Sequence, residues 1–296
     1  EEAAVPPVER WGWGSSLGTS FEDGIAFGEP TWLEQIAKFV RHVVTEDHVY
    51  ILGNSLGGYL AAKVSASEKD LSHRIKGLIL ANATPFWGWT SEGFTPWDGK
   101  LPAPSWVRPL ATTWYGALRG NILNILKTVY KQPEDASVLE RLGALASSIE
   151  EASTHPLGSA AFASILFAPK QTPSFGDALD MLTARGTPTL LLYGEDDPWI
   201  VPFWAWRAAN RISSNRSAQG SEYYALSPAG HCPHHETPIA FNRVLVNWIQ
   251  RMEGGLRSAS NREFASSVTW LEPGDISVGI AGEDAADVAI TVQRRL

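Results

Sequence analysis

The sequence has little cysteine, little methionine and no long apolar run. Its 296 residues include one cysteine, Cys232, and two methionines, Met181 and Met252. A single cysteine excludes a framework of internal disulfides. No apolar run approaches the roughly 18 residues of a membrane-spanning helix, so no transmembrane segment is predicted. The net charge of −8 argues against nucleic acid and against an anionic membrane surface as partners.

Apolar residues and tryptophan are abundant. Apolar residues make up 44% of the chain, which suffices for one large α/β domain or two ordinary domains. The 13 tryptophans are unevenly distributed, because five of them lie within residues 87–114. An aromatic-rich segment is therefore expected in the middle of the chain.

One segment joins a strand pattern to a nucleophile motif. Apolar and β-branched residues at 49–52 lead into a Gly-x-Ser-x-Gly sequence centred on Ser55, and a helix-like stretch, 59–65, follows. Strand, sharp turn and helix in this order are typical of the nucleophile elbow of serine hydrolases. Gly53 and Gly57 are expected to make room for the strained turn. The N–H of Leu56 is then one donor to the oxyanion.

Strand and helix patterns alternate on both sides of a long helical block. Buried strands are predicted at 49–53, 77–81, 187–194 and 222–227, with helices at 31–44, 203–212 and 238–252. A capping box of Thr31 and Glu34 is expected to begin the first helix. This alternation predicts a mostly parallel sheet covered by helices on both faces, as in the α/β-hydrolase fold.

The predicted organisation is a core with an inserted cap. Residues 1–83 and 187–253 form the core, and 84–186 form a helical cap with helices near 109–130, 134–151, 157–168 and 174–184. The tail, 254–296, either adds a short strand or two or stays loose. Residues 9–16 have the glycine spacing that follows the fourth strand of such folds, which places the first three strands outside this chain.

A truncated sheet has two expected consequences. The missing third strand would leave a long apolar edge beside the elbow strand, which is an aggregation hazard. The second oxyanion donor, which normally follows that strand, would also be missing. We therefore expect a chain that is incomplete at its N-terminus, poorly soluble and nearly inactive.

An acid and a histidine follow later strands in the order Ser, acid, His. Glu195, Asp196 and Asp197 come after the strand at 187–194, and Asp197 is favoured because it stands three residues after Gly194. His231 follows the next strand, after two small residues. A serine hydroxyl needs an imidazole to take its proton and a carboxylate to orient that imidazole. Ser55, Asp197 and His231 are therefore the candidate triad.

The histidine segment also raises the question of a metal. His234 and His235 lie close to His231, but a second cluster of ligands is lacking, so no metal site and no cofactor are predicted. Cys232 has no base of its own and is interpreted as a packing residue.

Several segments together resemble one family. Residues 52–59, 82–88, 155–169, 193–199 and 230–234 resemble, in the same order, the motifs of pheophytinases, the plant and algal chloroplast hydrolases of chlorophyll breakdown. The resemblance covers about residues 10–252. One departure is His235, where that family usually has an acid, so a local charge interaction is expected to differ.

The resemblance implies a substrate and a location. It implies that Ser55, Asp197 and His231 hydrolyse the phytyl ester of a magnesium-free chlorophyll. It also implies a chloroplast location and is compatible with peripheral association with thylakoid or lipid. Phe86, Trp87 and Trp199 are candidates to bind this hydrophobic ester. Alternatives are a chlorophyll dephytylase, a general lipid esterase, or a non-catalytic binder of hydrophobic ligands that retains the fold.

Overall fold

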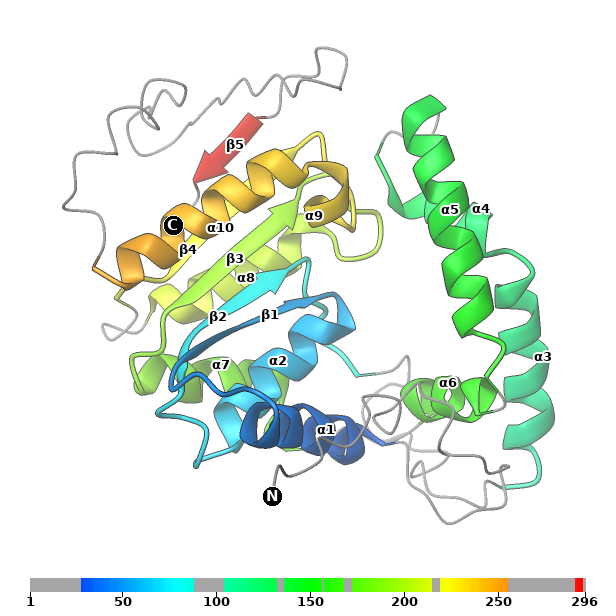
Figure 1. The fold of residues 1–296 in the computed structure, drawn as a ribbon, viewed down its shortest axis with the longest axis horizontal. Helices are drawn as coiled ribbons and strands as arrows, with labels where there is room; N and C mark the ends of the chain where they lie inside the picture. Colours follow the sequence, from blue (N-terminus) through cyan, green and yellow to red (C-terminus); the bar gives the residue numbers. More distant parts are fainter. Residues whose placement is uncertain are drawn as a thin grey trace.

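The protein has a central sheet with helices on both faces and a helical arm at one side (Figure 1). The computed structural model describes residues 28–87, 104–131, 136–155, 157–167, 172–214, 219–254 and 291–294. The segment 9–16 and residues 255–290 of the tail lie outside the described residues, as does Trp97.

Four parallel strands follow one another across the sheet in sequence order. They are β1 (Val49–Asn54), β2 (Ile75–Ala81), β3 (Thr189–Gly194) and β4 (Glu222–Ser227). All four lie at the predicted positions, which confirms the α/β fold. The tail adds β5 (Thr291–Arg294), which pairs antiparallel with β4.

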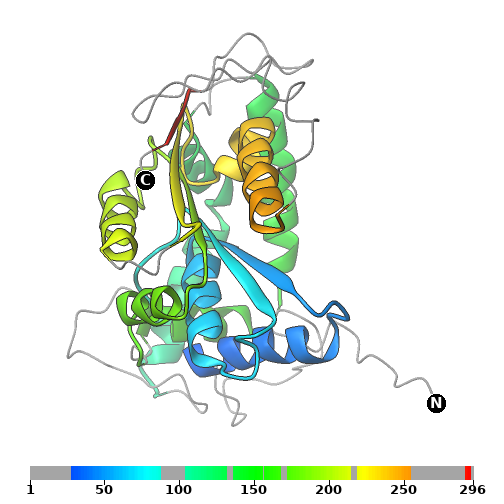
Figure 2. The same ribbon diagram turned by 90° about the vertical axis from the view of Figure 1, so that its left-hand side faces the viewer.

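Helices cover the two faces of the sheet because successive side chains of a strand point to opposite faces. Leu78 and Leu80 of β2 belong to the core beneath α2 (Leu56–Ser67), whereas Ile79 and Ala81 face α10 (Pro238–Met252). Figure 2 shows α10 on one side of the sheet and two further helices on the other. These are α7 (Phe175–Ala184) and α8 (Pro202–Ser213). Strands that are buried on both faces explain the continuous apolar runs of the sequence.

Four helices of the described residues lie between β2 and α7 in the chain. They are α3 (Val107–Arg119), α4 (Ile122–Val129), α5 (Ala136–Ala152) and α6 (Gly158–Phe167), of which α3, α4 and α5 form the arm at the right of Figure 1. α7, which the predicted cap of residues 84–186 includes, packs on α2 and shares its core cluster through Phe175, Leu179 and Leu182. We use "cap" below for α3 to α6.

Two local predictions differ from the structure. The first helix, α1 (Glu29–His42), begins before Thr31 and has Gly28 as its N-cap, so the predicted capping box of Thr31 and Glu34 does not form the start of the helix. The single helix expected at 109–130 is divided at Gly120 into α3 and α4.

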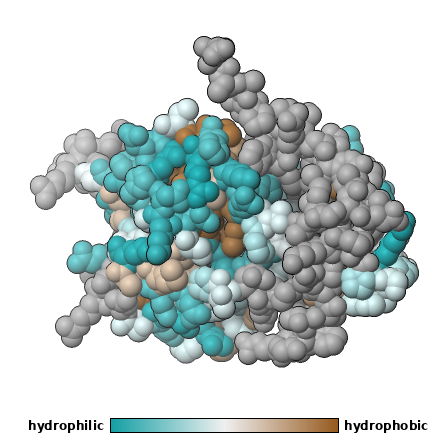
Figure 3. Space-filling view, turned by 90° about the horizontal axis from the view of Figure 1, so that it is seen from below, coloured by the Kyte–Doolittle hydropathy of each residue, from teal (hydrophilic) through white to brown (hydrophobic). Residues whose placement is uncertain are grey.

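β1 forms one edge of the described sheet, and β5 forms the other. Among the described strands β1 pairs with β2 alone, and its Leu52 is 43% exposed. The expectation of poor solubility rests on this edge and stays a prediction. Seen from the α1 side, most of the described surface is hydrophilic, with apolar residues in small areas (Figure 3). No helix among the described residues is long and apolar enough to cross a membrane.

Candidate active site

The turn after β1 holds Ser55 in a strained backbone conformation at the start of α2. Ser55 has φ 53° and ψ −121°, which a non-glycine residue rarely adopts. A Cβ at Gly53 would lie 2.2 Å from the carbonyl carbon of Gly57, and one at Gly58 would lie 2.4 Å from Cβ of Ala83. A Cβ at Gly57 would meet nothing within 4 Å. The close packing therefore requires glycine at Gly53 and Gly58, and the expectation for Gly57 is wrong.

Backbone hydrogen bonds fix the elbow against β2. The Ser55 N–H donates to the Ala81 carbonyl at 3.0 Å, and the Thr84 N–H donates to the Ser55 carbonyl at 3.1 Å. Leu56 is the first residue of α2. The first N–H groups of a helix have no acceptor within the helix, so the Leu56 N–H is suited to the oxyanion role proposed from the sequence.

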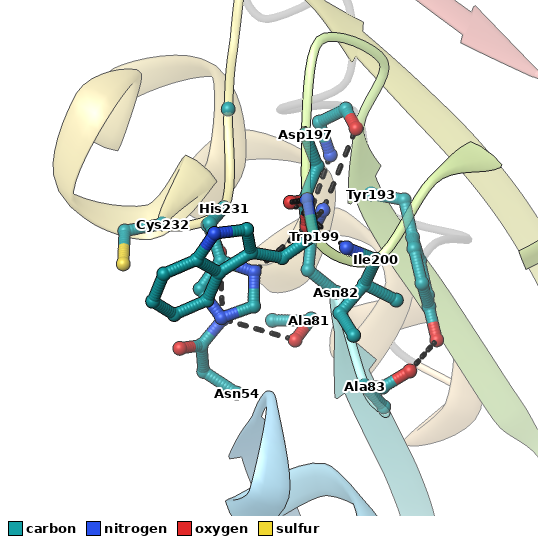
Figure 4. A network of polar contacts seen from close by, with 12 residues as sticks. Asn54, Ala81, Asn82, Ala83, Tyr193, Asp197, Trp199, Ile200, His231 and Cys232 are labelled. Carbon is teal, nitrogen blue, oxygen red and sulfur yellow. Dashed lines mark hydrogen bonds and ion pairs between the residues drawn. The ribbon is translucent and has the colours of Figure 1, made fainter. Parts of the chain in front are cut away.

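His231 and Asp197 are joined by a short hydrogen bond. His231 Nδ1 lies 2.7 Å from Oδ2 of Asp197 (Figure 4), and both side chains are almost fully buried. Oδ1 of Asp197 accepts from the N–H groups of Trp199 at 2.8 Å and Ile200 at 3.0 Å. Asp196 instead pairs with Lys131 at 3.0 Å. The structure thus brings His231 together with the acid that the spacing favoured.

The pKa of Asp197 reflects two opposing effects. Burial alone would raise it, but the hydrogen bond from His231 and those from two backbone amides outweigh burial, so the pKa lies below its ordinary value. The carboxylate therefore stays ionised at neutral pH and can orient the imidazole.

Sequence reasoning missed Asn82, a second partner of the acid. Asn82 is fully buried, and its Nδ2 donates to Oδ2 of Asp197 at 2.7 Å while its Oδ1 accepts from the Gly194 N–H at 2.8 Å (Figure 4). Its φ of 40° is a conformation that asparagine tolerates better than most residues. Its position directly after β2, at the carboxyl edge of the sheet, was the available signal.

Asn54 was also missed, although it directly precedes the nucleophile. Its Nδ2 donates to the backbone carbonyl of His231 at 3.0 Å and to that of Ala81 at 3.1 Å (Figure 4). The side chain therefore ties the histidine segment to the elbow, although the two lie 177 residues apart in the sequence.

The three aromatic residues predicted to bind substrate differ from one another in exposure and in their contacts. The Trp199 ring lies 5.4 Å from the His231 ring and is more than half exposed, and Phe86 is also exposed. Trp87 is fully buried in the core against Tyr59. We therefore keep Phe86 and Trp199 as candidates and assign Trp87 to packing.

An exposed aromatic surface continues from Phe86 onto α8. Phe86 contacts Trp204 edge-on at 4.8 Å, Trp204 contacts Phe203 at 5.3 Å, and Phe203 stacks on Trp206 at 6.2 Å. The Arg207 guanidinium lies over the rings of Phe203 and Trp204. Phe203 and Trp206 are more than half exposed, and a contiguous exposed apolar patch is typical of a binding surface.

Several hydrogen bonds join the cap to the histidine segment, residues 230–236, and one of them is accepted by the Glu236 carboxylate. Glu236, in the short helix α9 (Pro233–Glu236), accepts hydrogen bonds from the N–H groups of Gly230 at 3.0 Å, Cys232 at 3.1 Å and Lys131 at 2.8 Å. The His231 N–H donates to the carbonyl of Val129 at the end of α4, at 2.9 Å.

His235 takes part in the same junction between the cap and the core. Its Nδ1 lies 2.7 Å from the Tyr130 hydroxyl, and burial lowers its pKa. His235, which stands where the resembled family usually has an acid, therefore contacts the cap in this protein.

Replacing Glu236 by glutamine is expected to loosen this junction. One carboxylate oxygen becomes an NH2 group that faces backbone donors, and hydrogen bonds to a charged group contribute about 1.5–3 kcal/mol. We expect kcat/KM for a soluble ester to fall about 10- to 100-fold, since 1.4 kcal/mol corresponds to a factor of ten. Glu150→Gln, which removes the same charge from α5, should match the parent. Equal activity of both variants would show that the junction does not position His231.

The neighbouring cysteine and histidines show no sign of metal binding. Burial raises the pKa of Cys232 to about 11, so its thiol is neutral and unreactive at pH 7. Within the described part of the chain, no group of three His, Cys, Asp or Glu side chains could hold a metal ion. His234 packs against Phe241, and burial lowers its pKa.

The fold and this site place the chain in a known class. Residues 5–244 match the Alpha/beta hydrolase family, to which the chain belongs. Solved structures support the fold. An esterase from Thermogutta terrifontis aligns with TM-score 0.52 and 20% identity over 78% of this chain and 75% of its own. The enol-lactonase from Burkholderia xenovorans LB400 aligns with TM-score 0.52 and 17% identity over 78% of each chain.

A curated relative is more similar in sequence. The chain is 35% identical over 257 residues to the chloroplastic pheophytinase of Arabidopsis thaliana, which agrees with the resemblance noted from the sequence. The alignment covers 83% of this chain but 49% of the relative, so the chain spans about half the length of that protein.

Proposed function

We propose that the protein is a serine carboxylic-ester hydrolase with Ser55, Asp197 and His231 as its triad. The observation that carries the proposal is the 2.7 Å contact between His231 Nδ1 and Asp197 Oδ2, beside an elbow that holds Ser55 at φ 53°. Membership of the Alpha/beta hydrolase family supports the same reaction class.

The proposed reaction is acyl transfer in two steps. Ser55 Oγ attacks the ester carbonyl carbon while Nε2 of His231 takes the hydroxyl proton, and the Leu56 N–H donates to the oxyanion. When the C–O bond breaks, His231 returns that proton to the leaving alkoxide. Water then attacks the acyl-enzyme with His231 as base, which releases the acid and restores Ser55.

The proposed substrate is a pheophytin-like phytyl ester, cleaved to pheophorbide and phytol. The similarity to a pheophytinase supports this choice, as does the exposed ring of Trp199 beside His231. The exposed ring of Phe86, which continues through Trp204 to Phe203 and Trp206, supports it as well. Flat aromatic side chains offer stacking surface to a planar macrocycle. By the same similarity, we propose a chloroplast location.

Labelling by a fluorophosphonate probe tests the catalytic proposal. We expect the probe to modify the parent chain and to leave Ser55→Ala unlabelled. Ser65→Ala, a substitution further along α2, is the control and should be labelled like the parent. An unlabelled parent with correct folding by circular dichroism would favour the non-catalytic binder.

A substrate panel tests the finer proposal. The parent is expected to hydrolyse pheophytin in preference to chlorophyll and to a simple aryl ester, and Ser55→Ala should hydrolyse none of them. Equal rates on pheophytin and chlorophyll would favour a dephytylase, and activity on the aryl ester alone would favour a general esterase.

A further inference from the structure

One side of α3 carries an exposed apolar stripe. Trp106, Leu110, Trp114 and Leu118 recur every four residues, which places them along one side of the helix. Each of the four is 39–45% exposed. We propose that this stripe docks on a lipid surface with anionic headgroups, from which a lipid-like ester reaches the active site.

The stripe is not the main face by which α3 packs on α6. Val107 and Ala111 are buried against α6, and Tyr115, one turn further on, contacts Phe162 of α6. The stripe lies one residue before this buried row, so it is turned by about 100° around the helix. Of the stripe residues, Trp106 also contacts Phe167 of α6 edge-on at 5.8 Å, so α3 packs on α6 mainly through the buried row and through this one end of the stripe.

The charge of this segment complements an anionic surface. Residues 104–131 contain four cations, Arg108, Arg119, Lys127 and Lys131, and no aspartate or glutamate. Lys131 pairs with Asp196, and Arg119 donates to a serine hydroxyl, Ser153 Oγ. The net charge of −8 argued against an anionic membrane surface, but the local charge of this helix pair has the opposite sign.

The residue types and the position of α3 favour lipid over a protein partner. Tryptophan with basic neighbours is typical of helices that lie in the membrane interface, where the ring is half in an apolar and half in a polar layer. In Figure 1, α3 lies at the outer edge of the molecule, on the side opposite α8 and β4. A flat surface can therefore approach it without meeting the sheet.

Vesicle co-sedimentation of the full chain tests the proposal. We expect binding to phosphatidylcholine vesicles that contain phosphatidylglycerol and much weaker binding to phosphatidylcholine alone. Trp114→Ala should weaken the binding about tenfold, because one large apolar side chain is lost from the interface. Arg108→Glu with Lys127→Glu should remove the preference for anionic vesicles, since each basic residue near such a surface contributes about 1 kcal/mol, or roughly fivefold.

Matched controls separate the stripe from general hydrophobicity and charge. Phe39→Ala removes an equally exposed ring from α1, and Lys69→Glu reverses a charge in the turn after α2; both should bind vesicles like the parent. If Trp114→Ala binds as the parent does, the proposal is overturned. If Trp114→Ala instead only raises KM for a soluble ester, the stripe lines the substrate site, and the lipid-docking proposal is overturned as well.

The test is independent of catalysis, although the role in substrate delivery rests on the proposed function. Ser55→Ala should bind vesicles as the parent does. Fluorophosphonate labelling of Trp114→Ala should equal that of the parent. A chain that binds vesicles but is never labelled would refute the hydrolase proposal and leave the lipid surface intact.

Discussion

Asp197→Asn is expected to lower the rates of ester hydrolysis and of fluorophosphonate labelling by about 10⁴. The amide can present an N–H to His231 Nδ1 where the carboxylate presents only an acceptor. The imidazole would then carry its proton on Nε2, the nitrogen that must take the proton from Ser55. Because the 2.7 Å contact is buried, water cannot replace the lost acceptor.

Two neighbouring acids provide the control for this prediction. Glu195→Gln and Asp196→Asn change the same loop but keep the hydrogen bond between Asp197 and His231, so each should retain far more activity than Asp197→Asn. If Asp196→Asn lowers the activity by a similar factor, our proposal has assigned the orienting role to the wrong acid.

The lowered pKa of Asp197 adds a pH dependence with a definite sign. A carboxyl whose pKa is lower in the folded than in the unfolded protein stabilises the fold above its unfolded pKa, about 4, and this contribution is lost as the pH falls through the folded pKa. Urea unfolding of the parent and of Asp197→Asn should therefore show a free-energy difference that shrinks below about pH 4.

Lys63→Met is expected to destabilise the fold by about 3–5 kcal/mol, because it leaves a buried carboxylate without its cation. Lys63 Nζ lies 2.7 Å from Oε1 of Glu29, both side chains are fully buried, and Nζ also donates to the Pro173 carbonyl. The Tyr59 hydroxyl donates to Oε2 of Glu29 at 2.8 Å. The pair joins α1, α2 and the segment before α7.

Two further variants show whether burial of the ion pair causes the expected loss of stability. Lys38→Met removes a cation from an exposed pair with Glu34 on α1 and should cost at most about 0.5 kcal/mol. Glu29→Gln in the Lys63→Met background removes the buried negative charge that Lys63 paired with and should recover much of the loss. Urea unfolding measures all three, and a Lys63→Met variant as stable as Lys38→Met would contradict the prediction.

The site depends on residues that hold the triad as well as on the triad. Asn82 and two backbone amides fix Asp197, Asn54 ties the His231 segment to the elbow, and Glu236 joins that segment to the cap. These contacts connect the position of His231 to the docking of α4. A change in the cap can therefore alter catalysis without touching the triad.

Local patterns predicted much of the fold because they report burial directly. Continuous apolar runs predicted all four parallel strands, and glycine spacing predicted the elbow around Ser55. The same patterns did not separate α7 from the cap, because an apolar helical face looks alike whether it packs on α2 or on another cap helix. The helix start at Thr31 was wrong for a related reason, since a local capping signal does not exclude an earlier start.

By itself, the sequence determined the positions of the four parallel strands, the elbow and the candidates Ser55, Asp197 and His231, because each was recognised from residues close together in the chain. Only the tertiary structure decided that Asn82 and Asn54 support the site, that Trp87 is core, and that the stripe on α3 is exposed. These features arise from contacts between distant segments, and a side chain's partner or exposure depends on what the rest of the chain places around it.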